Sequence, residues 1–170
     1  MDDMIIKLTQ EINKKSFLEN VKVPILEGYH LVPNQGTLFT AISDKKGIEQ
    51  FLCDGFLENE SFEEHVEKVI HDIKNTMINY HFKAVENNIS FLKDYPTKDF
   101  HFKVYQQDNI INDKISRQYN MFFVDKKTNA FYQLAYSTPP YSIKDMSYIH
   151  DELAKNSIQV IDGLMNRVSY

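Results

Sequence analysis

The 170-residue sequence is poor in several residue types, and each shortage narrows what the chain can be. Its single cysteine, Cys53, excludes a disulfide within the chain and fits a reducing compartment. The arginines are Arg117 and Arg167, and the net charge is −5. Because nucleic-acid binders gather Arg and Lys on a basic surface, this composition argues against a nucleic-acid partner.

Long hydrophobic runs and targeting signals are also lacking. No apolar run approaches the roughly 18 residues that a membrane-spanning helix needs. Residues 1–7 lack the basic start and apolar run of a signal peptide. We therefore expect a cytoplasmic protein with no membrane span. The length favours one domain over residues 1–170, with 1–20 as an N-terminal helix or extension and 21–170 as the core.

Residues with catalytic potential are present, but they form no recognisable catalytic motif. Cys53 falls in a predicted strand, without the basic neighbour that would lower its pKa. No two histidines stand four residues apart, the spacing of helical zinc motifs. The acidic pair Glu63/Glu64 adjoins a predicted helix start, where carboxylates favour the helix dipole. We expect no catalytic residue, no metal and no cofactor, with an enzyme of unrecognised type as the less favoured alternative.

The first half of the chain predicts strands followed by a helix. Ser61 and Glu64 have the spacing of a capping box, and the apolar residues behind them recur at helical intervals, so we expect a helix over 61–79. Strands are predicted at 37–43 and 49–57, and an extended segment between Pro24 and Pro33. A short helix is predicted over 3–18, where 4–8 also suits a strand.

The second half predicts mainly hairpins and a final helix. The elements expected there are a tight hairpin of 82–86 and 89–93 around Asn87–Asn88, a strand over 100–105, a connection at 108–113, a long hairpin of 117–124 and 131–136, and a helix that starts near Ser142 and stops at Gly163. Consecutive strands with short turns favour antiparallel pairing. The fold class is therefore α/β of the α+β type, a mostly antiparallel sheet of about six or seven strands between helices.

Four residues on the long hairpin are candidates for a partner-binding surface: Arg117, Tyr119, Tyr132 and Tyr136. Tyrosine rings are enriched in protein interfaces, and Tyr132 and Tyr136 share one face of a regular strand. Arg117 is able to anchor a partner carboxylate. The alternative is that the tyrosines pack in the core beneath a covering helix and that Arg117 caps the sheet edge.

Several of these segments together resemble the PsbP-like α/β/α sandwich. The matching features are an early strand at Leu38–Ser43, the capped helix at Ser61–Asp72, a run of strands that reaches Arg117–Gln118, and a last strand at Phe131–Tyr136 followed by Ser137–Pro140 and a helix. In the bacterial chaperone branch for type VI secretion effectors, an Arg-Gln opens the strand before the last and a small residue–Pro step ends the sheet; the similar residues here are Arg117–Gln118 and Thr138–Pro139.

The chain also departs from that family. The tryptophan usual near the first strand is absent, and Gly28–Tyr29 takes its place, while the segment before Val21 is an addition. The resemblance implies a non-catalytic protein-binding module, such as a chaperone or adaptor for a secreted protein. A toxin immunity protein of the same fold, and a domain that binds a small apolar ligand, are the alternatives. The expected partner is another protein of unknown identity, and a homodimer is also an option.

Overall fold

An antiparallel sheet organises the chain, with strand order β1-β2-β3-β7-β6-β5-β4 and a short β8 paired with β6. The computed structural model describes residues 21–33, 36–43, 47–57, 59–79, 85–111, 113–138, 141–142 and 146–170. Its strands are β1 (Tyr29–Val32), β2 (Phe39–Ser43), β3 (Glu49–Phe56), β4 (Val85–Pro96), β5 (Phe100–Ile111), β6 (Lys114–Asp125), β7 (Ala130–Ser137) and β8 (Tyr141–Ser142). The helices are α2 (Phe62–Asn79) and α3 (Met146–Arg167). The expected α+β class with a mostly antiparallel sheet is thus confirmed.

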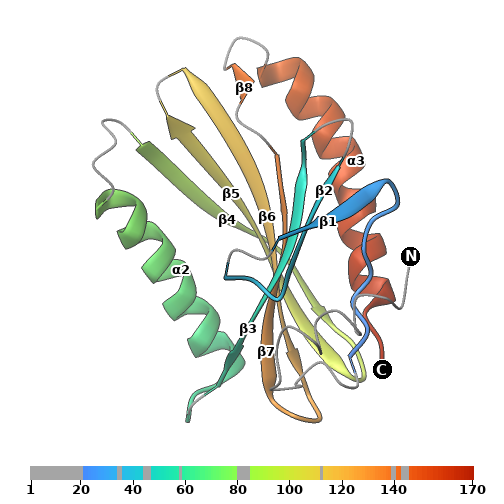
Figure 1. Ribbon diagram of the computed structural model, residues 1–170. Coiled ribbons are helices and arrows are strands. Elements are labelled where there is room, and N and C mark those ends of the chain that lie inside the picture. The colour runs from blue at the N-terminus through green and yellow to red at the C-terminus, as the bar shows by residue number, and fades with distance from the viewer. Residues whose placement is uncertain are drawn as a thin grey trace.

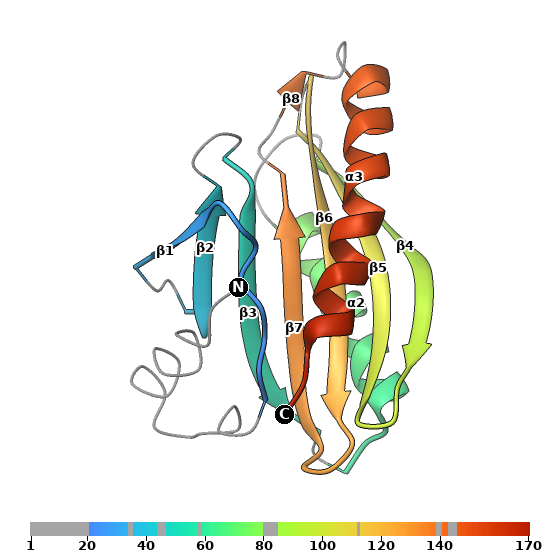
Figure 2. The same ribbon diagram turned by 90° about the vertical axis from the view of Figure 1, so that its right-hand side faces the viewer.

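The two helices lie on opposite faces of the sheet, which we call the α2 face and the α3 face (Figures 1 and 2). On the α3 face, Ile161, Leu164 and Met165 of the helix join a large apolar core with β5, β6 and β7. The segment 21–26 joins the same core through Val21 and Val23, and Lys22 pairs with Ser169 beside it. Helix α3 and this segment together cover the α3 face.

The core on the α2 face is smaller and lies toward one part of the sheet. Phe62 and Val66 of α2 pack on Phe122, Val124 and Phe131 of β6 and β7. The helix begins as its capping residues predict, since the Ser61 hydroxyl accepts a 3.2 Å hydrogen bond from the Glu64 amide. The expected helix over 61–79 is therefore confirmed.

The long hairpin forms as predicted from β6 and β7. At its turn the Asp125 carboxylate accepts hydrogen bonds of 2.9 Å from the Lys127 amide and 2.9 Å from the Thr128 hydroxyl. Asn129 takes a left-handed conformation with φ of 59°, which asparagine tolerates better than most residues. These local preferences fix the turn and hence the β6–β7 register.

The expected hairpin around Asn87–Asn88 is wrong. Strand β4 runs straight through both residues, which pair with Asn109 and Asp108 of β5. Residues 82–84 of that expected hairpin lie outside the described residues. Strand β5 likewise continues to Ile111, through most of the expected connection at 108–113. Pairing of two long strands satisfies more backbone groups than a tight turn would, which explains the difference.

Helix α3 also extends beyond its predicted end. It passes through Gly163 and ends at Arg167, because Leu164 and Met165 continue its buried stripe. A glycine within a helix costs only about 1 kcal/mol relative to alanine, which the burial of two large apolar side chains outweighs. The helix predicted over 3–18 lies outside the described residues.

Candidate functional site

Arg117 lies inside the protein and forms a two-pronged ion pair with Asp108. The guanidinium Nε and Nη2 donate to the two Asp108 carboxylate oxygens at 2.7 and 2.9 Å. The antiparallel register of β5 and β6 sets the two residues opposite each other. Burial lowers the pKa of Arg117, but the hydrogen bond and the charge of Asp108 raise it further, so its pKa ends above the ordinary value. Arg117 is therefore a positive charge neutralised within the chain.

The three tyrosines of the proposed contact surface are also buried. Tyr119, Tyr132 and Tyr136 are 3%, 0% and 4% exposed and face α3. The ring of Tyr132 stacks on Phe123 with centroids 5.0 Å apart, and Tyr119 lies 6.3 Å from Tyr136. The prediction that Arg117 and these tyrosines form an exposed partner-binding surface is wrong, because the tyrosines pack in the core with α3 and the segment 21–26, and Arg117 is only 6% exposed. The alternative of core packing holds for the tyrosines.

Arg117 near the start of the long hairpin and Thr138 just after its end contact each other directly. The Thr138 amide donates to the Arg117 carbonyl at 2.8 Å, and the Arg117 amide donates to the Thr138 hydroxyl at 3.0 Å. These bonds extend the β6–β7 ladder by one residue beyond β7. Arg117 and Thr138 thus have a structural role at the end of the hairpin.

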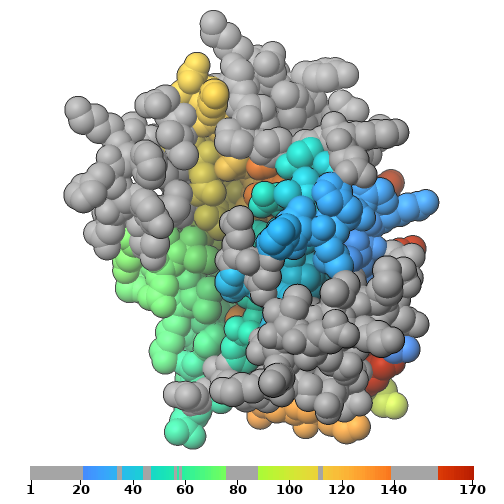
Figure 3. All heavy atoms as spheres, viewed as in Figure 1, coloured from blue at the N-terminus to red at the C-terminus, as the bar shows by residue number. Residues whose placement is uncertain are grey.

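The α2 face over β1, β2, β3 and β7 is the more open part of the sheet. In Figure 3 the yellow and orange strands are visible in the hollow between α2 (green) and β1–β3 (blue to cyan). Cross-strand neighbours Thr40 and Phe51 are half-buried there, although Phe51 pairs on its other side with the fully buried Ala135. Since α2 packs on β6 and the end of β7, this face retains side chains with access to solvent.

A chain of side-chain amides crosses the middle of this face. Asn120 is 1% exposed, and its carbonyl oxygen accepts from the Nε2 atoms of Gln118 at 2.6 Å and Gln133 at 2.8 Å. Its own amide donates to Gln107 at 3.2 Å, and Gln107 donates to Asn109 at 3.2 Å. Within the described part of the chain, the side-chain Oε1 atoms of Gln118 and Gln133 accept no hydrogen bond. They are hydrogen-bond acceptors for a bound group.

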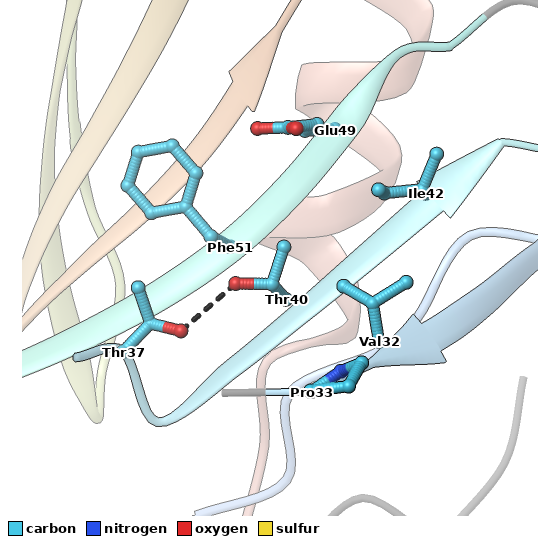
Figure 4. A pocket seen from close by; sticks show the side chains of 7 residues that line it. All are labelled: Val32, Pro33, Thr37, Thr40, Ile42, Glu49 and Phe51. Atoms are coloured by element: carbon cyan, nitrogen blue, oxygen red, sulfur yellow. Dashed lines mark hydrogen bonds between the residues drawn. The ribbon is translucent and has the colours of Figure 1, made fainter. Parts of the chain in front are cut away.

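A pocket of about 260 Å³ lies on the same face of the sheet, on the three strands β1–β3 (Figure 4). Its lining combines apolar and polar side chains: Val32, Pro33, Ile42 and Phe51 with Thr37, Thr40 and Glu49. The hydroxyls of Thr37 and Thr40 are hydrogen-bonded to each other at 2.9 Å. The Glu49 side chain is exposed at the rim, next to Ile42 of the neighbouring strand. The pocket therefore offers one carboxylate above an apolar floor.

Cys53 belongs to the same face, two residues along β3 from Phe51 and opposite Gln133 of β7. It is half-buried, and burial followed by the charge of Asp54 raises the pKa of its thiol. The thiol form therefore dominates at neutral pH, which is the opposite of what a nucleophilic cysteine requires.

The amino-acid sequence contains a signal for this face that the predicted contact surface did not use. Gln118 and Asn120 stand two residues apart in a strand that is otherwise largely apolar, and Glu49, Phe51 and Cys53 alternate in the same way. Alternation places each set on one face of its strand. The two sets come together because β7 lies between β3 and β6 in the sheet. The spacing of residues along the sequence does not reveal this order of strands.

Within the described ranges, no three residues of the types His, Cys, Asp and Glu gather so that they could hold a metal ion. Neither α2 nor α3, over their described residues, is long and apolar enough to cross a membrane.

Comparisons with known proteins add a structural similarity to this geometry. No model of a protein family matches the sequence, and no curated protein matches it. Among solved structures, the fold is similar to the crystal structure of LpqN, a protein involved in cell envelope biogenesis of Mycobacterium tuberculosis. The TM-score is 0.45 with 10% sequence identity, over 77% of this chain and 76% of that chain.

Proposed function

We propose that this chain is a non-catalytic protein-binding module that acts as a cytoplasmic chaperone or adaptor for a secreted protein. The observation that carries the proposal is the partly open α2 face, which holds both the Gln118 and Gln133 amides and the pocket lined by Phe51. Protein interfaces combine a partly apolar centre with hydrogen-bonding groups around it, and this face offers both. We assign the contact surface to this face instead of the buried tyrosines.

The more specific proposal of a chaperone or adaptor follows from the sequence resemblance to the PsbP-like family. A PsbP-like sandwich of the secretion-chaperone branch is consistent with an antiparallel sheet between two helices, and it motivates the words chaperone and adaptor. A toxin immunity protein of the same fold would use the same face against a different partner. Fold alone does not choose between them.

A small apolar ligand is the less favoured occupant. The pocket on β1–β3 holds about 260 Å³, whereas pockets for drug-sized ligands start near about 300 Å³. Its lining includes Glu49, Thr37 and Thr40, so a purely apolar molecule would strip water from polar groups without replacing their hydrogen bonds. A polypeptide satisfies the same groups with its own donors.

Site-specific photo-crosslinking in native lysate tests the proposal. A C53S variant carries a new cysteine at Thr40 for attachment of the crosslinker, and a matched variant carries it at the exposed Gln159 of α3. We expect one discrete crosslinked protein from position 40 and none of that mass from position 159. Identical products from both positions, or no product from position 40, would contradict the proposal. A crosslink between two copies of the chain would identify a homodimer on this face.

A further inference from the structure

The pocket on β1–β3 has a chemical character that specifies its occupant more closely. Its apolar lining comes from three strands, with Val32 of β1, Ile42 of β2 and Phe51 of β3, and Pro33 follows β1 at the side. Figure 4 shows these side chains projecting from the same face of the sheet as Glu49. An unbranched aliphatic group fits the apolar lining, and a positively charged group fits beside the Glu49 carboxylate at the rim.

Glu49 is the polar group of the pocket that is available to a ligand. It is exposed, and within the described ranges its carboxylate forms no hydrogen bond or ion pair. Thr37 and Thr40 already hydrogen-bond to each other across the pocket. The strand neighbour of Glu49 on β7 is Ser137, which carries no charge, so no nearby partner on that strand neutralises the carboxylate.

We propose that this pocket receives a lysine or arginine side chain of the bound polypeptide, an assignment that rests on the proposed protein-binding function. The aliphatic stem packs on Val32, Ile42 and Phe51, and the terminal cation meets the Glu49 carboxylate. The aromatic ring of Phe51 adds a favourable surface for the cation. The net charge of −5 on the whole chain favours the approach of a basic segment.

The size of the pocket agrees with a single side chain. Its volume of about 260 Å³ is open to solvent on one side, which suits an extended side chain entering from a bound polypeptide. The backbone of that polypeptide would continue over β7 and β6, where the side-chain oxygens of Gln133 and Gln118 are available as acceptors for its N–H groups.

An NMR titration of the full chain tests the inference with blocked amino acids as probes. The probes are the Nα-acetyl methylamides of lysine, arginine and norleucine, and the signals are the methyl groups of Val32 and Ile42. Norleucine has an aliphatic stem like that of lysine without its charge. We expect both basic probes to bind about fivefold more tightly than norleucine, the modest gain typical of a partly exposed ion pair.

Two charge-removing variants complete the test. Glu49→Gln should abolish the preference for the basic probes, whereas Glu27→Gln, an exposed glutamate outside the pocket, should leave it unchanged. Equal affinity for norleucine, an unchanged preference in Glu49→Gln, or no shift of the methyl signals at about 100 mM probe would overturn the inference. If the crosslinked partner binds Glu49→Gln as tightly as the parent chain, the pocket assignment fails while the protein-binding proposal stands. If position 40 captures no partner, the proposed function fails whatever the probes show.

Discussion

Arg117 and Asp108 form a two-pronged ion pair inside the sheet, with side chains only 8% and 16% exposed. Asp108→Asn keeps the shape of the pair and removes its negative charge, so the buried guanidinium loses its counterion. We expect the free energy of unfolding to fall by about 3 kcal/mol in a urea titration, as is usual when one partner of a buried pair is removed.

A second aspartate provides the matched control for that experiment. Asp94 of β4 contacts His101 at 2.5 Å, but its side chain is 46% exposed. Asp94→Asn should therefore change the free energy of unfolding by less than about 1 kcal/mol. Equal losses for the two variants would show that Arg117 is better hydrated than its burial indicates.

Gln50 should stabilise the N-terminal part of the described chain. Its side chain is fully buried, donates to the Pro24 carbonyl at 2.7 Å and accepts from the Leu26 amide at 3.0 Å. Gln50→Leu leaves both backbone groups without partners, so we expect a loss of about 2–4 kcal/mol. Hydrogen exchange of the Leu26 amide should accelerate in the variant. Gln159→Leu on the exposed surface of α3 is the control, and protection of Leu26 that is the same in both variants would contradict this role.

Because its tyrosines are buried, the protein should have a lower free energy of unfolding at alkaline pH. Burial, followed by the charges of Asp125 and Asp54, raises the pKa of Tyr132 well above its ordinary value. An unfolded tyrosine ionises near pH 10, so the stabilisation is complete below that pH and is lost as the pH rises toward the folded pKa. Each such tyrosine contributes a slope of up to about 1.4 kcal/mol per pH unit.

Denaturant titrations between pH 8 and pH 11.5 measure that slope. Tyr132→Phe removes the ionisable group, so its free energy of unfolding should fall less steeply above pH 10 than that of the parent chain, whatever its stability at pH 8. An identical slope in both proteins would mean that the Tyr132 hydroxyl ionises as easily in the folded state as in the unfolded one.

The elements that the sequence predicted correctly are those with local signals. Helix α2 has its cap at Ser61, and the β6–β7 hairpin has its turn at Asp125–Asn129. The hairpin at Asn87–Asn88 was wrong because asparagine permits a left-handed turn without requiring one, and pairing with β5 favoured an extended strand.

The candidate site depended on contacts that are distant in sequence. Whether Tyr132 and Tyr136 are buried is decided by α3 and the segment 21–26, which no spacing within the hairpin reveals. The pocket brings Val32, Ile42 and Glu49 together from three strands. Alternation predicts which residues of one strand share a face, but only the sheet order shows which face the helices leave open.

The central claim is that a protein partner binds the α2 face over β1–β3. Its most direct test is the affinity of the crosslinked partner for two variants with the same added charge, Thr40→Arg in the pocket and Gln159→Arg on α3. A large side chain at position 40 occupies the pocket from within the chain. We predict that Thr40→Arg weakens binding at least about tenfold, the effect of losing one anchor contact, while Gln159→Arg binds like the parent chain. Unchanged affinity in a folded Thr40→Arg variant would contradict the claim.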